Sequence, residues 1–511
     1  MTSTGHLIER QGRSPRLTGD TGLALALFVI GVVSRIPFHS QLLYHWDSVN
    51  FALGMERFDV RLHQPHPPGY LLYVLLGQLV NALTGDANTS LVWISIVFGG
   101  LTVSGVYLLG RRLFGRSEAL IGALFALTMP AFWFYGEVAL TYIIEAFFVT
   151  AIAIACLDAM RGSPRAAFAS AILLGLAGGI RQTTLVLMLP VWLFSLRRID
   201  WRRRCVALGL LALTCAGWFA PTVILSGGLA DYLEASRAIG GGVLASLELF
   251  KGGTSFLDPF ARLGMYSIYG LMLGLVAIGY GLIKVATQAR ATLRRWLPDT
   301  RFQVLALWLI PNLILYAPLV RAPGHTFSFM PALVILAAAA LVMLGRNLAH
   351  RFARPASRIT TALTGAVLIT NIVFFLAAPP YLFGIQRVIT TTPSWSTIQY
   401  RDRYIAERVA YITQHFDPAT TLILTAGPDY RHPDYYLREY PTLNQQGDSL
   451  TSDAPAGAQT LVFFSHGLTS RQNGIQQAVL PGGDALLYLR LPAHSQIVVE
   501  GSEVSVQPQA Q

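Results

Sequence analysis

Apolar runs of about twenty residues, the length of a membrane-crossing helix, recur along the chain between residues 22 and 377. A helix rises about 1.5 Å per residue, so such a run crosses the ~30 Å hydrocarbon layer of a bilayer. The composition agrees, because 53% of the 511 residues are hydrophobic and only 13% are charged. The sequence therefore predicts an all-α polytopic membrane protein.

Arginine clusters between the apolar runs set their orientation. Such clusters stay in the cytoplasm by the positive-inside rule, so the net charge of +11 indicates topology and not a nucleic-acid partner. We expect a cytoplasmic N-terminus followed by an uncleaved first span over residues 22–38. The six basic clusters are Arg10 to Arg16, 111–116, 160–165, 196–204, 284–301 and 345–358.

Two apolar runs, 68–84 and 90–110, lie between the first span and the basic cluster at 111–116. If both runs crossed the membrane, this cluster would lie outside, so one of them must stay on the outer surface. The first run is the shorter and opens with a Pro-Pro step, which favours an interfacial helix. Residues 39–89 then form one external loop with two short surface helices.

Residues 166–196 are apolar and have basic clusters at both ends. A hairpin of two short helices that turns near Gly178-Gly179 keeps both ends in the cytoplasm. Each arm of about fifteen residues rises only ~22 Å, so Arg181 at the turn is expected to be recessed below the outer surface. An arginine at that depth needs a polar cavity or an anion beside it.

The remaining spans bring the predicted total to about eleven, with the C-terminus outside. A second external loop is expected over residues 225–262. The other spans are predicted at 90–110, 117–134, 141–160, 205–224, 263–285, 302–320, 326–344 and 359–377.

The chain becomes polar after Pro379-Pro380. Residues 396–416 have the pattern of an amphipathic helix, and several short apolar segments after them have the pattern of strands. We therefore divide the chain into a membrane part, 1–378, and a small extracytoplasmic α/β domain, 379–511. The predicted strands are 421–427, 459–465, 485–491 and 495–501.

With this topology, the ionisable side chains away from the basic clusters gather at the outer end of the molecule, and none lies convincingly at the middle of a full-length span. A conduit for ions or protons would place such groups at the midplane, so the pattern favours a site that opens to the outer face. The three cysteines, Cys156, Cys205 and Cys215, have neither metal-ligand spacing nor the pattern of a disulfide framework.

The first outer loop carries Asp47 in HWDSVNF, followed by His66-Pro67-Pro68 at the start of the expected surface helix. This arrangement resembles the GT-C superfamily of polyprenyl-phosphate-sugar-dependent glycosyltransferases, in particular the protein O-mannosyltransferase and aminoarabinose transferase branch. The resemblance covers about residues 20–200 in motif and the rest in layout. Many relatives carry an acidic pair in this motif, whereas Ser48 follows Asp47 here, so the role of a second carboxylate does not carry over.

The resemblance implies a GT-C fold and an inverting transfer of a sugar from a polyprenyl-phosphate donor to a glycan, lipid or protein acceptor outside the cell membrane. It implies no redox cofactor, and it leaves a divalent cation open, for which the sequence offers no clear ligand set. His63 and His66 are three residues apart, but no further metal ligand clusters with them. A transporter or flippase of lipid-linked saccharides is the alternative, and it would show matching halves with broken helices.

Asp47 is the predicted base, because transfer to a hydroxyl needs a proton acceptor beside that hydroxyl. The alternative is that Asp47 caps the helix that begins after it. Arg181 is predicted to hold the departing phosphate, since a guanidinium matches phosphate oxygens; pairing with a helix end is its alternative. Arg321 and His325 are secondary candidates for the same anion, or interfacial anchors.

Four further residues are expected to support the substrate or the base. Glu137 could orient the sugar or the acceptor, or be a solvated acid in a turn. Glu145 lies one turn into a span, where it should face the cavity or pair with an arginine. His66 could donate to Asp47 or to substrate, or serve only to start a helix, and Tyr70 could stack on a sugar or belong to the aromatic belt.

Overall fold

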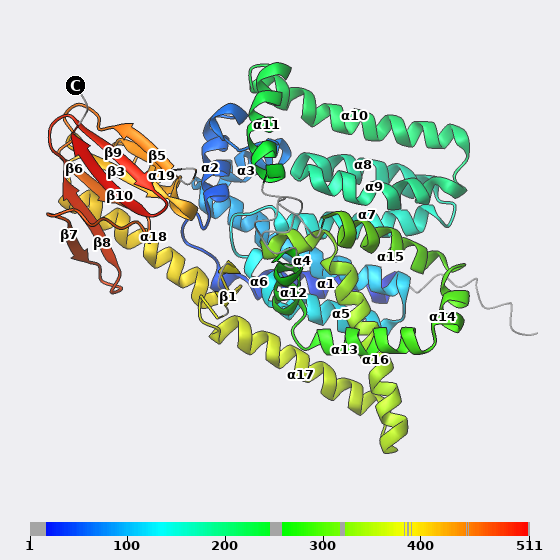
Figure 1. Ribbon diagram of the computed structural model, residues 1–511. Coiled ribbons are helices and arrows are strands. Elements are labelled where there is room, and N and C mark those ends of the chain that lie inside the picture. The colour runs from blue at the N-terminus through cyan, green and yellow to red at the C-terminus, as the bar shows by residue number, and fades with distance from the viewer. Residues whose placement is uncertain are drawn as a thin grey trace, which may run out of the picture.

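The computed structural model describes residues 17–245, 258–316 and 322–508, apart from 383, 386, 387, 390, 446 and 448. Figure 1 shows two parts: a bundle of helices, and two small sheets at one end of it that are reached through the long helices α17 and α18. Helices α2 and α3 lie at the end of the bundle that faces these sheets.

Six helices of the described residues are long and apolar enough to cross a membrane. Three further apolar helices are shorter, so the predicted count of about eleven spans stays a prediction. The six are α1 Leu17–Val33, α4 Ala87–Leu113, α7 Tyr142–Ala159, α10 Trp201–Leu225, α16 Met330–Phe352 and α17 Ala356–Ala377. The remaining helices of the membrane part are α2 Trp46–Glu56, α3 Leu71–Thr84, α5 Arg116–Thr128, α6 Pro130–Tyr135, α8 Pro164–Ile180, α9 Gln182–Ser195, α11 Leu229–Ala245, α12 Asp258–Leu271, α13 Gly274–Thr287, α14 Ala289–Trp296 and α15 Thr300–Pro311. Short 3₁₀ or π turns lie at Ile36–Phe38, Val60–Leu62, Leu196–Arg198, Asn312–Tyr316 and Pro323–Ser328.

The two ambiguous regions fold as predicted in outline. The run after the Pro-Pro step forms α3, whose 14 residues are too few to cross the ~30 Å hydrocarbon core upright. Helices α8 and α9 form the predicted hairpin, but it turns at Arg181 and not at Gly178-Gly179. The glycines serve close packing instead, since a Cβ on Gly179 would lie 2.5 Å from Leu72 and 2.8 Å from Trp218.

Two predicted spans are interrupted. The span expected over 263–285 is two helices, α12 and α13, that meet at an angle of 113°. Met272 between them has a φ of 46°, which interrupts the regular hydrogen bonds of a helix. The span expected over 117–134 is α5 followed by α6, because Pro130 cannot continue the hydrogen bonding of α5 and instead begins α6.

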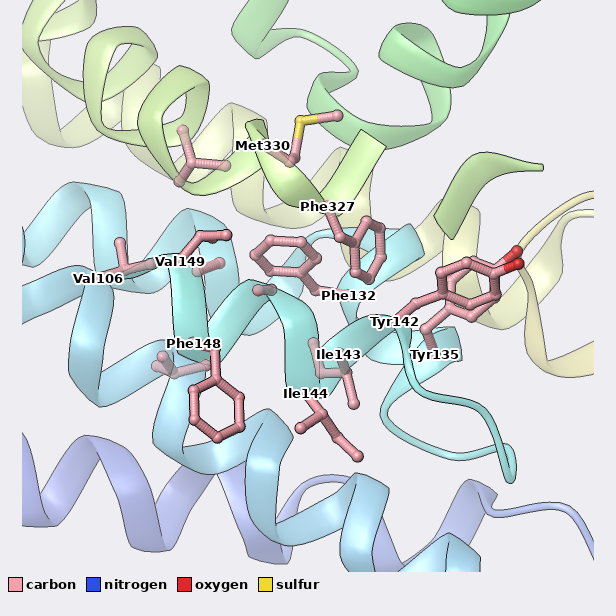
Figure 2. Packing of buried hydrophobic residues seen from close by; sticks show 14 of the residues in the cluster. Val106, Phe132, Tyr135, Tyr142, Ile143, Ile144, Phe148, Val149, Phe327 and Met330 are labelled. Carbon is pink, nitrogen blue, oxygen red and sulfur yellow. The ribbon is translucent and has the colours of Figure 1, made fainter. Parts of the chain in front are cut away.

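Apolar side chains fill the space between α4, α5, α7 and α16. Figure 2 shows this core, where the Phe132 and Phe327 rings meet at 4.6 Å between centroids. At one edge of the core, Tyr135 and Tyr142 pack with ring centroids 5.0 Å apart, and their hydroxyls point away from the apolar cluster. The core therefore ends at a polar, aromatic edge beside the segment that precedes α2, where the Tyr44 ring packs on Phe134.

The C-terminal part confirms the predicted helix and all four predicted strands. Helix α18 spans Trp395–His415 and α19 spans His432–Tyr436, after a 3₁₀ turn at Gly427–Asp429. One sheet has the order β4-β3-β6-β8-β7, a second has the order β10-β9-β5, and β1 pairs with β2. The strands are β1 Gly384–Ile385, β2 Val388–Ile389, β3 Thr421–Ala426, β4 Thr442–Gln445, β5 Ser449–Asp453, β6 Thr460–Phe463, β7 Gln476–Val479, β8 Ala485–Arg490, β9 Ser495–Glu500 and β10 Glu503–Pro508.

The five-stranded sheet is covered on both faces. Alternate residues of β3 point to opposite sides, so Ile423 packs with Ile412 of α18, while Leu422 and Leu424 pack with Ile497 of the three-stranded sheet. Strand β3 is parallel to both β4 and β6. The carboxyl end of β3 leads to the 3₁₀ turn and α19, which approach the first outer loop.

Candidate functional site

Helix α2 presents Asp47 in its first turn. The N-cap is His45, whose Nδ1 accepts a hydrogen bond from the backbone N–H of Asp47 at 3.2 Å. Ser48 completes the cap, because its Oγ accepts from the backbone N–H of His45. The alternative that Asp47 caps this helix is therefore wrong, because His45 is the N-cap. The Asp47 carboxylate is left for other contacts.

Two imidazoles flank this carboxylate. The Asp47 oxygens lie 3.5 Å from His66 Nδ1 and 3.6 Å from His45 Nδ1. Burial raises the pKa of Asp47, but the nearby His66, His45 and Arg181 outweigh it, so its pKa lies below the ordinary value. Burial also lowers the pKa of both histidines. At neutral pH the site therefore holds an ionised carboxylate between two neutral rings.

The hairpin turn places Arg181 inside the protein, paired with Glu145. Its Nε lies 3.0 Å from Glu145 Oε2, and its Nη1 donates to Thr141 Oγ1 at 3.1 Å. The other oxygen of Glu145 accepts a hydrogen bond from Thr184 at 2.8 Å. The guanidinium also lies over the Tyr142 ring, 4.6 Å from its centroid. Of the two outcomes expected for Glu145, the structure shows the ion pair.

The fold brings Arg181 to the same region as Asp47. Gln182, the first residue of α9, donates to the Pro68 carbonyl at 3.2 Å, which ties the hairpin turn to the His-Pro-Pro segment. The charge of Arg181 acts on both Asp47 and His66. Residues predicted from separate segments therefore share one electrostatic environment.

Tyr70 and His325 contact this region through their rings. Tyr70 has a φ of 47° at the start of α3, and its ring lies 4.9 Å from that of His66. The His325 ring lies 5.5 Å from that of Tyr142. Arg321, the other residue predicted for the phosphate, lies outside the described residues.

Glu137 lies elsewhere, in the turn before α7, where it is fully buried. The buried charge of Arg35 acts on Glu137, and Arg35 packs closely against Gly99 and Gly136. The Glu137 backbone carbonyl accepts from the N–H of Ser40. Glu137 is thus not a solvated acid, and its backbone carbonyl helps to fix the segment that begins at Ser40.

A cavity of about 450 Å³ lies between the membrane part and the C-terminal domain and is lined by residues of both. Neither Asp47 nor Arg181 lines it, but His45 and Tyr142, which contact them, do. Tyrosines dominate its walls and come from both parts of the protein: Tyr44, Tyr135, Tyr142, Tyr266, Tyr381, Tyr400 and Tyr404.

The sequence did not point to the charged residues of this cavity. Arg401 of α18 and Asp429 form an ion pair at 2.5 Å in its wall, and Tyr404 donates to Asp429 at 2.8 Å. Asp429 could have been found, because it follows the carboxyl end of a parallel strand, where sites of α/β sheets collect. Arg262 lies on α12 one turn before Tyr266, and its charge acts on that tyrosine.

No group of three or more His, Cys, Asp or Glu side chains is arranged to hold a metal ion in the described part of the chain. His63 and His66 accordingly lack a third ligand there. The sequence left a divalent cation open, without a clear ligand set, and nothing in the comparisons tests that point.

Comparisons with known proteins bear on the membrane part and on the overall fold. Residues 65–224 match the family model of dolichyl-phosphate-mannose-protein mannosyltransferases. This segment is less than half of the chain; it contains His66 and Arg181 but begins after Asp47. No curated protein matches the sequence.

The chain is similar in structure to ArnT from Cupriavidus metallidurans. The apo structure of that protein is 14% identical, with a TM-score of 0.53, over 93% of this chain and 98% of that one. Its structure bound to undecaprenyl phosphate gives a TM-score of 0.51 at 13% identity, over 93% of this chain and 97% of that one. The Archaeoglobus fulgidus oligosaccharyltransferase with Zn and sulfate has a TM-score of 0.49 at 14% identity, over 92% of this chain and 75% of that one. The resemblance to the GT-C superfamily is thus confirmed, by the family model over residues 65–224 and by the fold over nearly the whole chain.

Proposed function

We propose that the protein is a membrane glycosyltransferase that moves a sugar from a polyprenyl-phosphate donor to an acceptor hydroxyl on the extracytoplasmic face. The observation that carries the proposal is the setting of Asp47: an ionised, partly exposed carboxylate beside an aromatic cavity, with arginine charge nearby. The matched family is one of transferases that use a lipid-phosphate sugar, and ArnT has been seen with undecaprenyl phosphate bound.

In the proposed reaction, Asp47 accepts the proton of the acceptor hydroxyl as that oxygen attacks the anomeric carbon. The bond from this carbon to the phosphate oxygen breaks, and the polyprenyl phosphate leaves with the bonding electrons. A single displacement of this kind inverts the configuration of the sugar. Asp47 suits the role of base because its contacts are with neutral groups, the two imidazoles and the Trp46 side chain, and leave carboxylate lone pairs for a proton.

The departing phosphate needs positive charge in a site from which water is largely excluded. Arg181 shares its charge with Glu145, so we propose that it acts together with Arg262, which lies near Tyr266 on the far wall of the cavity. The roles predicted for Arg321 and His325 remain part of this proposal. Replacing Arg262 with methionine should raise the KM for the donor by a larger factor than it lowers kcat.

The cavity is the proposed place of the transferred sugar. A sugar presents apolar C–H faces and hydroxyl groups, and the cavity offers tyrosine rings for the first and phenol hydroxyls for the second. The charged pair in its wall, Arg401 with Asp429, is internally neutralised. The C-terminal domain then contributes directly to binding the sugar or the acceptor.

The test uses the purified full-length protein in detergent with synthetic polyprenyl-phosphate sugars. Wild type should release sugar from the donor to an acceptor, and Asp47→Asn should not. If both proteins leave every donor intact while lipid-linked sugar still crosses proteoliposome membranes, the protein is a transporter and the proposal fails.

A further inference from the structure

The C-terminal domain holds the segment just before Asp47. Asp402 of α18 accepts hydrogen bonds from three consecutive residues of the first outer loop: Ser40 Oγ at 2.8 Å, Gln41 N at 2.8 Å and Leu42 N at 3.1 Å. Burial raises the pKa of this carboxyl group. Three charge-assisted contacts from one side chain fix the direction in which the loop enters α2.

The next two residues of the loop are held in the same way. Tyr436 OH accepts from the N–H of Leu43 at 2.8 Å, and His432 Nε2 contacts the Leu43 carbonyl at 2.9 Å. Arg401 Nε donates to the Tyr44 carbonyl at 3.0 Å. Each residue from 41 to 44 therefore has a backbone hydrogen-bond partner in the C-terminal domain.

A second contact reaches the site itself. Arg431, which follows the 3₁₀ turn of the C-terminal domain, donates through Nε to Asn50 Oδ1 at 3.0 Å and through Nη2 to the Leu62 carbonyl at 3.3 Å. Asn50 is buried within α2, one turn after Asp47. Its amide nitrogen lies 3.5 Å from His66 Nδ1, the same atom that lies 3.5 Å from Asp47.

Hydrogen-bond chemistry fixes the orientation of the Asn50 amide between Arg431 and His66. A guanidinium has donors only, so the Asn50 atom beside Arg431 must be the carbonyl oxygen, and the NH₂ group must face His66. A donor at that place favours the imidazole with its proton on Nε2 and its lone pair on Nδ1. With no proton on Nδ1, His66 does not donate to Asp47. The other groups whose charge or polarity reaches Asp47 are His45, Trp46, Arg181 and Tyr430.

We propose that Arg431 is a positioning residue: through Asn50 it fixes the orientation and proton placement of His66, and so leaves the Asp47 carboxylate free to act as base. The C-terminal domain thus completes the catalytic site and is more than a platform for the acceptor. This inference rests on the proposed role of Asp47.

The experiment compares Arg431→Met and Asn50→Leu with wild type in the full-length protein. Either change lets His66 place its proton on Nδ1 and donate to Asp47, which would weaken the base. We expect kcat to fall about tenfold or more while the KM for the donor stays unchanged, as when a reacting group is misplaced. Arg431 also bonds to Asp434 and to the Leu62 carbonyl, but both changes remove the contact between Arg431 and Asn50. Because that shared contact is the one that sets the proton of His66, the double variant should be no slower than Asn50→Leu alone.

The proton itself gives a second readout. In ¹⁵N-histidine-labelled protein in liposomes, the His66 signal is identified by its loss in His66→Gln. Wild type should show His66 protonated on Nε2, and both variants should show a population protonated on Nδ1. Asn50→Leu carries this test even if Arg431→Met does not fold, since it acts at the same contact from the other side.

Arg438→Met is the matched control. Arg438 belongs to the same domain and forms an ion pair with Glu56 at the far end of α2, but this pair is about half exposed and does not touch Asn50 or His66. It should leave kcat and the His66 signal as in wild type. Equal losses in Arg438→Met and Arg431→Met, additive losses in the double variant, or an unchanged His66 signal would each overturn the inference.

These outcomes differ from failure of the proposed function. If Asp47→Asn transfers sugar as well as wild type, the base has been assigned wrongly. If Asp47→Asn is inactive while Arg431→Met behaves as wild type, only the positioning role is lost.

Discussion

Asp47 and Glu145 are two acidic residues of the membrane part with opposite surroundings. Asp47 keeps 19% of its side chain exposed and contacts imidazoles that are neutral at neutral pH. Glu145 is buried, pairs with Arg181 and accepts from Thr184. The lone pairs of a carboxylate that is paired with a permanent cation are engaged in that ion pair. A carboxylate beside neutral rings still has lone pairs that can accept a proton. Arg181 links the two, because it pairs with one and its charge acts on the other.

The largest effect of the contrast between Asp47 and Glu145 is expected on the transfer rate when Asp47 is replaced. Asp47→Asn keeps the shape and removes the proton acceptor, so transfer should fall about 10²- to 10⁴-fold. The thermal unfolding midpoint should stay near that of wild type, since His45 and not Asp47 caps α2. Radiolabelled donor gives the rate, and unfolding in detergent gives the control. A large drop in the midpoint would mean that Asp47 is structural after all.

The opposite result is expected at Glu145. Glu145→Gln leaves Arg181 buried without its counter-ion, which should cost about 3–5 kcal/mol of stability. The double variant Glu145→Leu, Arg181→Met removes both charges and should recover part of that loss. Thermal unfolding of the three proteins measures this directly. Full stability with lost transfer in Glu145→Gln would show that Glu145 acts on the substrate and would break the contrast with Asp47.

Smaller effects are expected in the cavity wall. Tyr400→Leu removes one aromatic face, a change of ~0.5–1.5 kcal/mol in binding, so the KM for donor or acceptor should rise severalfold while kcat stays constant. Tyr411→Leu is the control, because Tyr411 lies on the same helix and stacks on His415 outside the cavity. Equal effects of the two changes would argue against a sugar at this place.

The predicted topology can be checked without activity. Arg57 is 71% exposed next to α2, and Ser117 lies exposed at the start of α5. A membrane-impermeant thiol reagent should label Arg57→Cys from outside, and it should label Ser117→Cys only after the membrane is opened. Outside labelling at residue 117 would mean that α3 crosses the membrane. The predicted topology, which places Asp47 and Arg181 on the same side of the membrane, would then be wrong.

Local patterns in the sequence were enough for several elements. The basic clusters at both ends of 166–196 predicted the α8 and α9 hairpin, and the polar segment after Pro380 predicted α18 and four strands. Strand β7 escaped prediction because its sequence, QQAV, is polar and three of its four residues are exposed. The bend between α12 and α13 was missed because the apolar composition continues across it.

The partners of the site residues were harder to predict. Asp47, His66 and Arg181 could be named from motif and depth, but the Arg181 pair with Glu145 joins residues 36 positions apart and depends on how α7 and α9 pack. Arg401, Arg431 and His432 lie more than 300 residues from the loop and helix that they contact. No local pattern encodes that docking.

His432 gives the docking of the C-terminal domain a pH limit of its own. Burial, with the nearby charge of Arg401, lowers the pKa of this imidazole from 6.5 to about 3. The unfolded chain therefore binds a proton more readily below pH 6.5, so the stability held by this contact is lost progressively as the pH falls toward 3. His432→Gln should flatten this acid dependence of the unfolding midpoint. The Asp47 carboxylate stays ionised through most of this range, so acid should weaken the docking of the C-terminal domain before it protonates Asp47.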